Sequence, residues 1–329
     1  MLTAFPSRSK KETKMKFRLL LASLLGTSNG GSIGMDGALT TADVPAKFLE
    51  DVYFVNQVPI MALQVDTRIS YALYVPEAQY NPDPSKNPTP AKLPLLVYVH
   101  GTGRNIASMY TDLAAFANST SCAVLAPLFP AGMDGPNDID SYKELSSEKL
   151  RSDLGLLSVL DQVAYRWPGL ETEKVFMMGF SGGGQFAHRF LYLYPERLSA
   201  ISIGSPGRPT FLDDTQDWPL GIADVQDVFN KKVDTGLIGD VTIQFVVGSK
   251  DAELHGDEDF WQWKNDTLGS GGLPPMNVTR LESIQQLRES FTDAGIESQF
   301  EIVDGVAHDE MGVRKTVFGF LQPEIQKGR

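Results

Sequence analysis

The chain has 329 residues, of which 42% are hydrophobic and 21% are charged, a composition typical of a globular protein and not of a disordered one. Its 41 acidic residues outnumber its 29 basic ones, and the formal charge of −12 argues against binding to nucleic-acid phosphates. The only cysteine, Cys122, excludes an intramolecular disulfide and cysteine-based zinc or iron–sulfur sites. Because Cys122 opens an apolar run, we expect it to be a core residue and not a nucleophile.

Residues 1–40 are expected to form a basic leader followed by a flexible linker. Basic side chains concentrate in residues 1–18, ahead of an apolar run at 19–25 that is too short to span a bilayer. This pattern fits a signal peptide and a disordered leader about equally well. Sequons at Asn118, Asn265 and Asn277 add slightly to the case for secretion. Secretion is therefore slightly favoured if the leader is a signal peptide, and the cytoplasm otherwise.

The remaining residues, 41–329, alternate apolar runs with stretches of helical spacing. The apolar runs predict strands at 66–75, 93–99, 122–127, 174–179, 198–203, 241–248 and 299–303. Helices are predicted at 148–167, 185–194, 280–293 and 311–321. The alternation is typical of one α/β domain with a mostly parallel central sheet and helices on both faces. Residues 206–239, with an acidic helix-like stretch at 222–229, are a candidate cap insertion.

A serine motif stands between the strand at 174–179 and the helix at 185–194. Residues 179–183 read G-F-S-G-G and fit the pattern G-x-S-x-G, which exposes a serine hydroxyl on a sharp strand-to-helix turn. Gly179 and Gly183 would allow the strand and the helix to approach closely. The pattern predicts that Ser181 is a nucleophile, and the alternative is an incidental serine in a glycine-rich turn.

A serine nucleophile needs a base, and the base needs an acid that orients it. In this kind of fold the three follow the order serine, acid, histidine, each after a later strand. Among four histidines, only His308 follows both the serine and a late strand, whereas His100 is expected to position a loop. Asp251 follows the strand at 241–248 and is the predicted acid, with Glu253 as the second choice. Activity should then rise with pH through about 6.5, as a histidine base loses its proton.

An acyl-transfer site also needs backbone donors for the oxyanion. One donor is expected at Gly182, directly after the serine. The other is expected in the loop His100-Gly101-Thr102-Gly103, where Thr102 is our choice. Each such donor typically contributes about 10²–10³ in kcat.

With these residues in view, the chain resembles the α/β-hydrolase superfamily from about Asp51 to the C-terminus. The segments 95–105 and 179–184 resemble the polyhydroxybutyrate depolymerase and feruloyl esterase-like group of serine esterases. Members of that group often carry a glycine where this chain has Arg104. The resemblance implies an α/β-hydrolase fold and a metal-free, cofactor-free serine hydrolase with the triad Ser181, Asp251 and His308. Its substrate would be a small-molecule carboxylic ester or thioester, cleaved through an acyl-enzyme.

Other interpretations share these residues. An acyltransferase, a peptidase or a natural-product-pathway hydrolase could use the same triad, and an inactive binding protein could share the scaffold. A dinucleotide site is disfavoured because residues 101–106 lack the third glycine of the fingerprint. The acidic run 251–259 is expected to form a solvated loop rather than a metal site. The aromatic residues at 260–263 are expected either to pack in the protein interior or to form an apolar rim over the substrate. The sequence predicts no stable membrane span and leaves the oligomeric state open.

Overall fold

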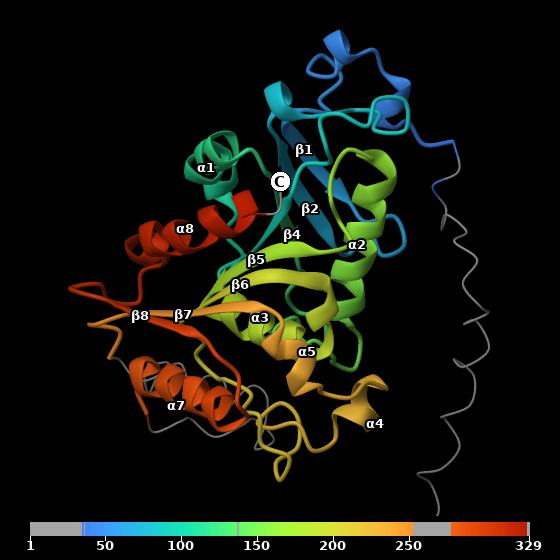
Figure 1. Ribbon diagram of the computed structural model, residues 1–329. Helices are drawn as coiled ribbons and strands as arrows, with labels where there is room; N and C mark the ends of the chain where they lie inside the picture. Colours follow the sequence, from blue (N-terminus) through green and yellow to red (C-terminus); the bar gives the residue numbers. More distant parts are fainter. Residues whose placement is uncertain (1–34, 36, 137, 253–277, 328–329) are drawn as a thin grey trace, which may run out of the picture. The chain divides into compact units, whose positions relative to one another are not determined.

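The computed structural model describes residues 35, 37–136, 138–252 and 278–327. The chain divides into two units, residues 1–36 and 37–329, and the second contains every described helix and strand. Its eight strands form one sheet in the order β1-β2-β4-β3-β5-β6-β7-β8 (Figure 1). They are β1 Asn56–Ala62, β2 Ser70–Val75, β3 Leu95–Val99, β4 Ala123–Leu128, β5 Val175–Phe180, β6 Leu198–Gly204, β7 Thr242–Gly248 and β8 Gln299–Val303.

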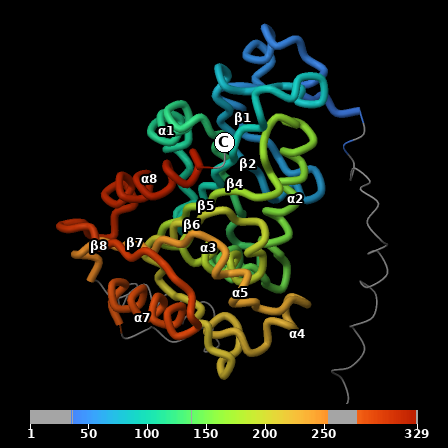
Figure 2. Tube along the Cα trace, viewed as in Figure 1, coloured from blue at the N-terminus to red at the C-terminus, as the bar shows by residue number. Residues whose placement is uncertain are grey.

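Only the β1–β2 end of this sheet is antiparallel. Strand β1 pairs with β2, and β2 with β4, in antiparallel register, whereas every pair from β4 to β8 is parallel. Figure 2 follows the chain through β7, α7 and β8, and β7 pairs with β8 at the far end of the sheet. The prediction of a mostly parallel sheet is confirmed.

Helices cover both faces of the sheet. They are α1 Asp112–Thr120, α2 Ser152–Arg166, α3 Gly182–Leu193, α4 Val225–Phe229, α5 Thr235–Gly239, α7 Arg280–Asp293 and α8 Glu310–Lys327, with short 3-10 helices at Thr41–Asp43, Ala46–Phe48, Glu77–Gln79, Ala107–Tyr110 and Pro195–Arg197. Side chains alternate across β3, so Leu96 and Tyr98 join the core beneath α1 and α8. Leu95, Val97 and Val99 join the core beneath α2, α3 and α7. Figure 1 shows α1 and α8 lying together beside the sheet.

The observed elements differ from the predicted ones mainly at their ends. Helix α2 begins at Ser152 and not at 148, because residues 146 and 151 pair in an isolated bridge ahead of it. Helix α8 continues past the expected end at 321 to Lys327. Strand β1 was not predicted: it is exposed along much of its length and contains Pro59, which is a residue found in edge strands.

The segment 206–239 is attached to helix α3 through two buried basic side chains. His188 Nε2 accepts a hydrogen bond from the N–H of Thr210 at 2.8 Å, and Arg189 Nε donates to Thr210 Oγ1 at 2.7 Å. The indole of Trp218 donates to Glu144 O at 2.8 Å. The helix expected at 222–229 is the short α4. That this segment acts as a cap stays a prediction.

Asn118 lies on the exposed side of α1, where its amide donates to Tyr74 Oη at 2.8 Å. The other two sequons and the basic leader lie outside the described residues. Across the described part of the chain, no helix has the length and hydropathy needed to cross a bilayer.

Candidate active site

Ser181 forms the turn between β5 and α3. Its backbone has φ +56° and ψ −116°, a region that non-glycine residues enter at a cost of about 1–3 kcal/mol. The Ser181 N–H donates to Gly204 O of the neighbouring strand β6 at 2.9 Å, which holds the strained turn against the sheet. The turn leaves the serine partly exposed at the carboxyl end of β5.

Close backbone contacts explain the glycines beside the serine. A Cβ atom added to Gly179 would lie 2.3 Å from Gly183 O, and one added to Gly183 would lie 2.1 Å from Val99 O. Neither position accepts a side chain, so the start of α3 packs directly on β5 and β3. This is the close approach that the motif predicts.

Asp251 and His308 meet at the ends of β7 and β8. His308 Nδ1 lies 2.7 Å from Asp251 Oδ2, and Asp251 is buried at 1% exposure. Because a carboxylate only accepts hydrogen bonds, Nδ1 carries the proton and Nε2 is left as the basic nitrogen. The two loops are joined by backbone bonds: Ser249 N–H donates to Val303 O at 2.9 Å, and Lys250 N–H donates to Val306 O at 2.8 Å.

The imidazole of His308 packs beside the Ser181 turn. Its ring centroid lies 4.9 Å from that of Phe180, the residue before Ser181. Among the described residues, no hydrogen bond joins Ser181 Oγ to His308. The structure therefore brings Asp251 and His308 into contact and leaves Ser181 short of hydrogen bonding to the imidazole. Hydrogen bonds in unliganded catalytic sites are often long and tighten when substrate binds.

Thr102 and Gly182 face each other next to the serine. A Cβ atom placed on Gly182 would lie 2.9 Å from Thr102 N and 2.9 Å from Thr102 Oγ1. Within the described residues neither of the two backbone N–H groups donates a hydrogen bond. Two free donors therefore lie close together beside Ser181, as an oxyanion hole requires.

His100 supports the Thr102 loop from inside the protein. Its Nε2 accepts a hydrogen bond from Phe129 N–H at 3.2 Å, so Nδ1 carries the proton and donates to Gly101 O at 2.8 Å. Burial lowers the pKa of His100 to about 4, and the ring is neutral at physiological pH. The ring packs between the buried rings of Phe129 and Tyr142. That His100 positions the loop stays a prediction.

No protein-family model and no curated protein sequence matches this chain. Solved structures do match it. A poly(3-hydroxybutyrate) depolymerase from Bordetella parapertussis is 18% identical with a TM-score of 0.60, and the match covers 88% of this chain and 96% of that one. A poly(aspartic acid) hydrolase from Sphingomonas sp. KT-1 is 19% identical with a TM-score of 0.55, covering 76% and 92%. A ferulic acid esterase is 13% identical with a TM-score of 0.54, covering 81% and 96%.

This chain has the α/β-hydrolase fold. The strand order, the two helical layers and the serine turn after β5 all agree with that fold. The identities are too low to show more than the fold, so the chemistry of this chain depends on its own residues.

Two residues near the site were not found by sequence reasoning. Tyr142 is buried, and its hydroxyl donates to His100 O at 3.1 Å and would lie 2.5 Å from a Cβ on Gly182. Arg280 begins α7, and its Nη1 lies 3.5 Å from Asp251 Oδ1. No local pattern marks Tyr142. The capping box that begins at Thr279 fixes the start of α7 and is a signal that places Arg280 at a helix N-terminus.

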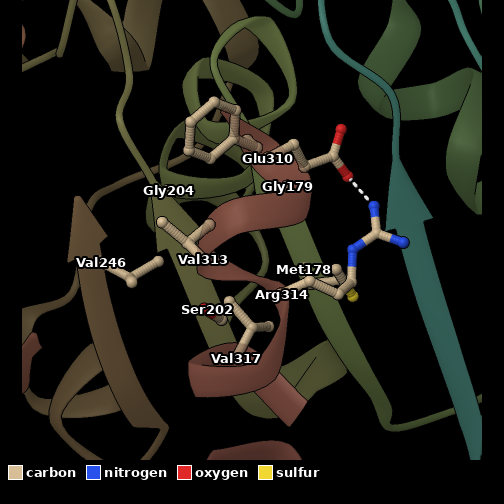
Figure 3. Close-up of a pocket in the computed structure, with 10 residues that line it drawn as sticks. Met178, Gly179, Ser202, Gly204, Val246, Glu310, Val313, Arg314 and Val317 are labelled. Atoms are coloured by element: carbon tan, nitrogen blue, oxygen red, sulfur yellow. Dashed lines mark hydrogen bonds and ion pairs between the residues drawn. The ribbon is translucent and has the colours of Figure 1, made fainter. Parts of the chain in front are cut away.

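Charged side chains fix the start of α8, two residues after His308. The buried guanidinium of Arg314 donates to Asp112 Oδ2 at 2.5 Å and pairs with Glu310. Tyr98 Oη donates to Glu310 Oε2 at 3.2 Å. Figure 3 shows the Glu310–Arg314 pair beside the apolar side chains of α8 that face the sheet. These contacts hold the C-terminal side of the His308 loop on β3 and α1.

Several sequence-predicted features lie outside the described residues. They are Glu253, most of the acidic run 251–259 and the aromatic residues at 260–263. Within the ranges that the structure describes, no group of three or more histidine, cysteine or acidic side chains could hold a metal ion. Cys122 is described and is buried next to Thr120, as expected of a core residue.

Proposed function

We propose that this protein is a serine hydrolase that cleaves a carboxylic ester or thioester through an acyl-enzyme. The observation that carries the proposal is the 2.7 Å hydrogen bond between Asp251 and His308, made where the imidazole packs on Phe180 beside the Ser181 turn. A buried acid, an oriented imidazole and a partly exposed serine match the three parts that nucleophilic acyl transfer needs.

In the first half of the proposed reaction, Ser181 Oγ attacks the substrate carbonyl carbon while His308 Nε2 takes the serine proton. Thr102 N–H and Gly182 N–H stabilise the negative charge that forms on the carbonyl oxygen. The C–O or C–S bond to the leaving group then breaks, and the leaving group departs with the proton held by His308. Asp251 keeps the imidazole in the required tautomer and stabilises its charged form.

In the second half, water replaces the leaving group. His308 takes a proton from water, the hydroxide attacks the acyl-enzyme, and Ser181 Oγ recovers the proton as the acid is released. No step needs a metal or an organic cofactor. The names of two similar structures, a poly(3-hydroxybutyrate) depolymerase and a ferulic acid esterase, support an ester as the substrate class.

A fluorophosphonate probe tests the proposal directly, because such probes phosphonylate activated serines. We expect the protein to be labelled at Ser181 and to hydrolyse p-nitrophenyl esters of graded chain length. The Ser181→Ala variant should lose both properties while its thermal unfolding stays close to that of the wild type. Labelling at another residue, or equal ester turnover by both proteins, would refute the proposal.

A further inference from the structure

Arg104 has a backbone conformation that residues other than glycine rarely adopt. Its φ is +55°, in the left-handed region, where a side chain is strained and persists only if the surrounding contacts require it. The residue closes the turn that starts at Gly101, because Arg104 N–H donates to Gly101 O at 3.0 Å. Thr102 lies inside this turn.

The guanidinium of Arg104 joins two loops through backbone carbonyls. Nη1 donates to Thr102 O at 2.8 Å, Nε donates to Phe129 O at 3.2 Å, and Nη2 donates to Pro130 O at 3.1 Å. Phe129 and Pro130 directly follow β4, whereas Thr102 follows β3. The planar fork of an arginine can hold acceptors on both loops at once, which the single ammonium of a lysine cannot do in the same geometry.

The Arg104 side chain also contacts Tyr142, which packs next to Gly182. The Arg104 guanidinium lies 4.9 Å from the ring centroid of Tyr142, a distance at which cation and ring attract. The hydroxyl of Tyr142 would lie 2.5 Å from a Cβ on Gly182. Arg104 therefore contacts Thr102 directly and reaches Gly182 through one intervening side chain.

Arg104 holds the peptide units on both sides of Thr102. Its guanidinium bonds Thr102 O in the following unit, and its backbone N–H bonds Gly101 O in the preceding unit, which carries the Thr102 N–H. In a trans peptide the carbonyl and the following N–H point in opposite directions. Gly101 O is held by Arg104 N–H and by His100 Nδ1, at 3.0 Å and 2.8 Å. The Thr102 N–H belongs to the same peptide unit, so it is directed away from those partners and left for a ligand.

We propose that Arg104 is a positioning residue that holds the Thr102 N–H at the site where the oxyanion forms. The inference rests on the proposed function, because an oxyanion forms only during acyl transfer. A displaced donor weakens binding of the transition state more than binding of the ground-state ester. Loss of the guanidinium should therefore lower kcat and leave KM nearly unchanged.

The test compares Arg104→Gly and Arg104→Lys with a matched control, Arg197→Lys. The guanidinium of Arg197 also donates to backbone carbonyls, Glu173 O at 2.6 Å and Thr172 O at 2.9 Å, but lies ahead of the amino end of β6. Glycine suits the positive φ, so Arg104→Gly removes the guanidinium without adding strain.

For both Arg104 variants we expect kcat for a p-nitrophenyl ester to fall about 10- to 100-fold, with KM within about threefold of the wild type. The affinity for a trifluoromethyl ketone, which forms an oxyanion adduct with an active serine, should fall by a similar factor. Added methylguanidinium should restore part of the kcat of Arg104→Gly, and Arg197→Lys should behave as the wild type.

Wild-type kcat in Arg104→Gly, or equal losses of kcat in Arg104→Lys and Arg197→Lys, would overturn the inference and leave the proposed function standing. Ser181→Ala is assayed in parallel. If that variant keeps full ester turnover, the proposed function itself fails.

Discussion

Asp251 divides its two carboxylate oxygens between His308 and Arg280. Oδ2 lies 2.7 Å from His308 Nδ1, and Oδ1 lies 3.5 Å from Arg280 Nη1. The carboxylate is fully buried, so water screens its interactions with the two partners only weakly. Helix α7 is tied to the same residue through its backbone, because Leu281 N–H donates to Asp251 O at 3.1 Å.

Replacing Asp251 with asparagine should lower kcat for an ester by about 10²–10⁴, because an amide neither stabilises the charged imidazole nor fixes its tautomer. Asp304→Asn is the control, since Asp304 is an exposed carboxylate on the same loop as His308 and bonds to Ser249 Oγ at 3.3 Å. Steady-state kinetics of the two variants check the prediction. Equal kcat values for them would argue against Asp251 as the acid.

A methyl group at Gly182 should block the space between the two candidate oxyanion donors. The added Cβ would lie 2.9 Å from Thr102 N and 2.5 Å from Tyr142 Oη. We expect Gly182→Ala to lower kcat at least about 100-fold, the typical effect of losing one oxyanion donor. Gly103→Ala tests the same loop, because a Cβ there would meet nothing within 4 Å. Similar activity of both variants would show that the space at Gly182 is not used.

The buried histidines should make the protein less stable as the pH falls. Burial lowers the pKa of His100 from 6.5 to about 4 and that of His188 well below its usual value. The unfolded chain then binds more protons than the folded one between about pH 6.5 and pH 4. Each histidine contributes stability that is complete above pH 6.5 and is lost as the pH falls below that value, by up to about 1.4 kcal/mol per pH unit. For His100 this loss continues to about pH 4.

Urea unfolding at several pH values between 4.5 and 7.5 checks this expectation. In His188→Gln the free energy of unfolding should depend less steeply on pH than in the wild type, even though the variant is less stable at pH 7. An unchanged slope would mean that His188 is not kept neutral by the fold.

The parallel part of the fold was predictable because burial on both faces leaves a continuous apolar run. All five residues of β3 are buried, and the run at 93–99 was recognised from its composition. Strand β1 is half solvated and contains a proline, so it gave no such signal. Helix α7 and strand β8 were predicted with their observed ends, 280–293 and 299–303.

The sequence predicts only those site residues that follow the end of a strand. The order of Ser181, Asp251 and His308 along the chain was sufficient to select them, and the structure brings the last two together. The contacts of Arg280 and Tyr142 depend on how distant segments pack, which no local pattern records. Their roles, like those of the three selected residues, stay predictions until the variants are measured.

The bonds that join the β7 and β8 loops have a consequence for motion. Gly305 N–H donates to Ser249 Oγ at 2.8 Å, in addition to the two backbone bonds between these loops. Asp251 and His308 are therefore expected to move together when the β7 and β8 loops move. Such a motion would keep the Asp251–His308 hydrogen bond and would change the distance from the imidazole to Ser181. We expect substrate binding to shorten that distance without rearranging the two loops.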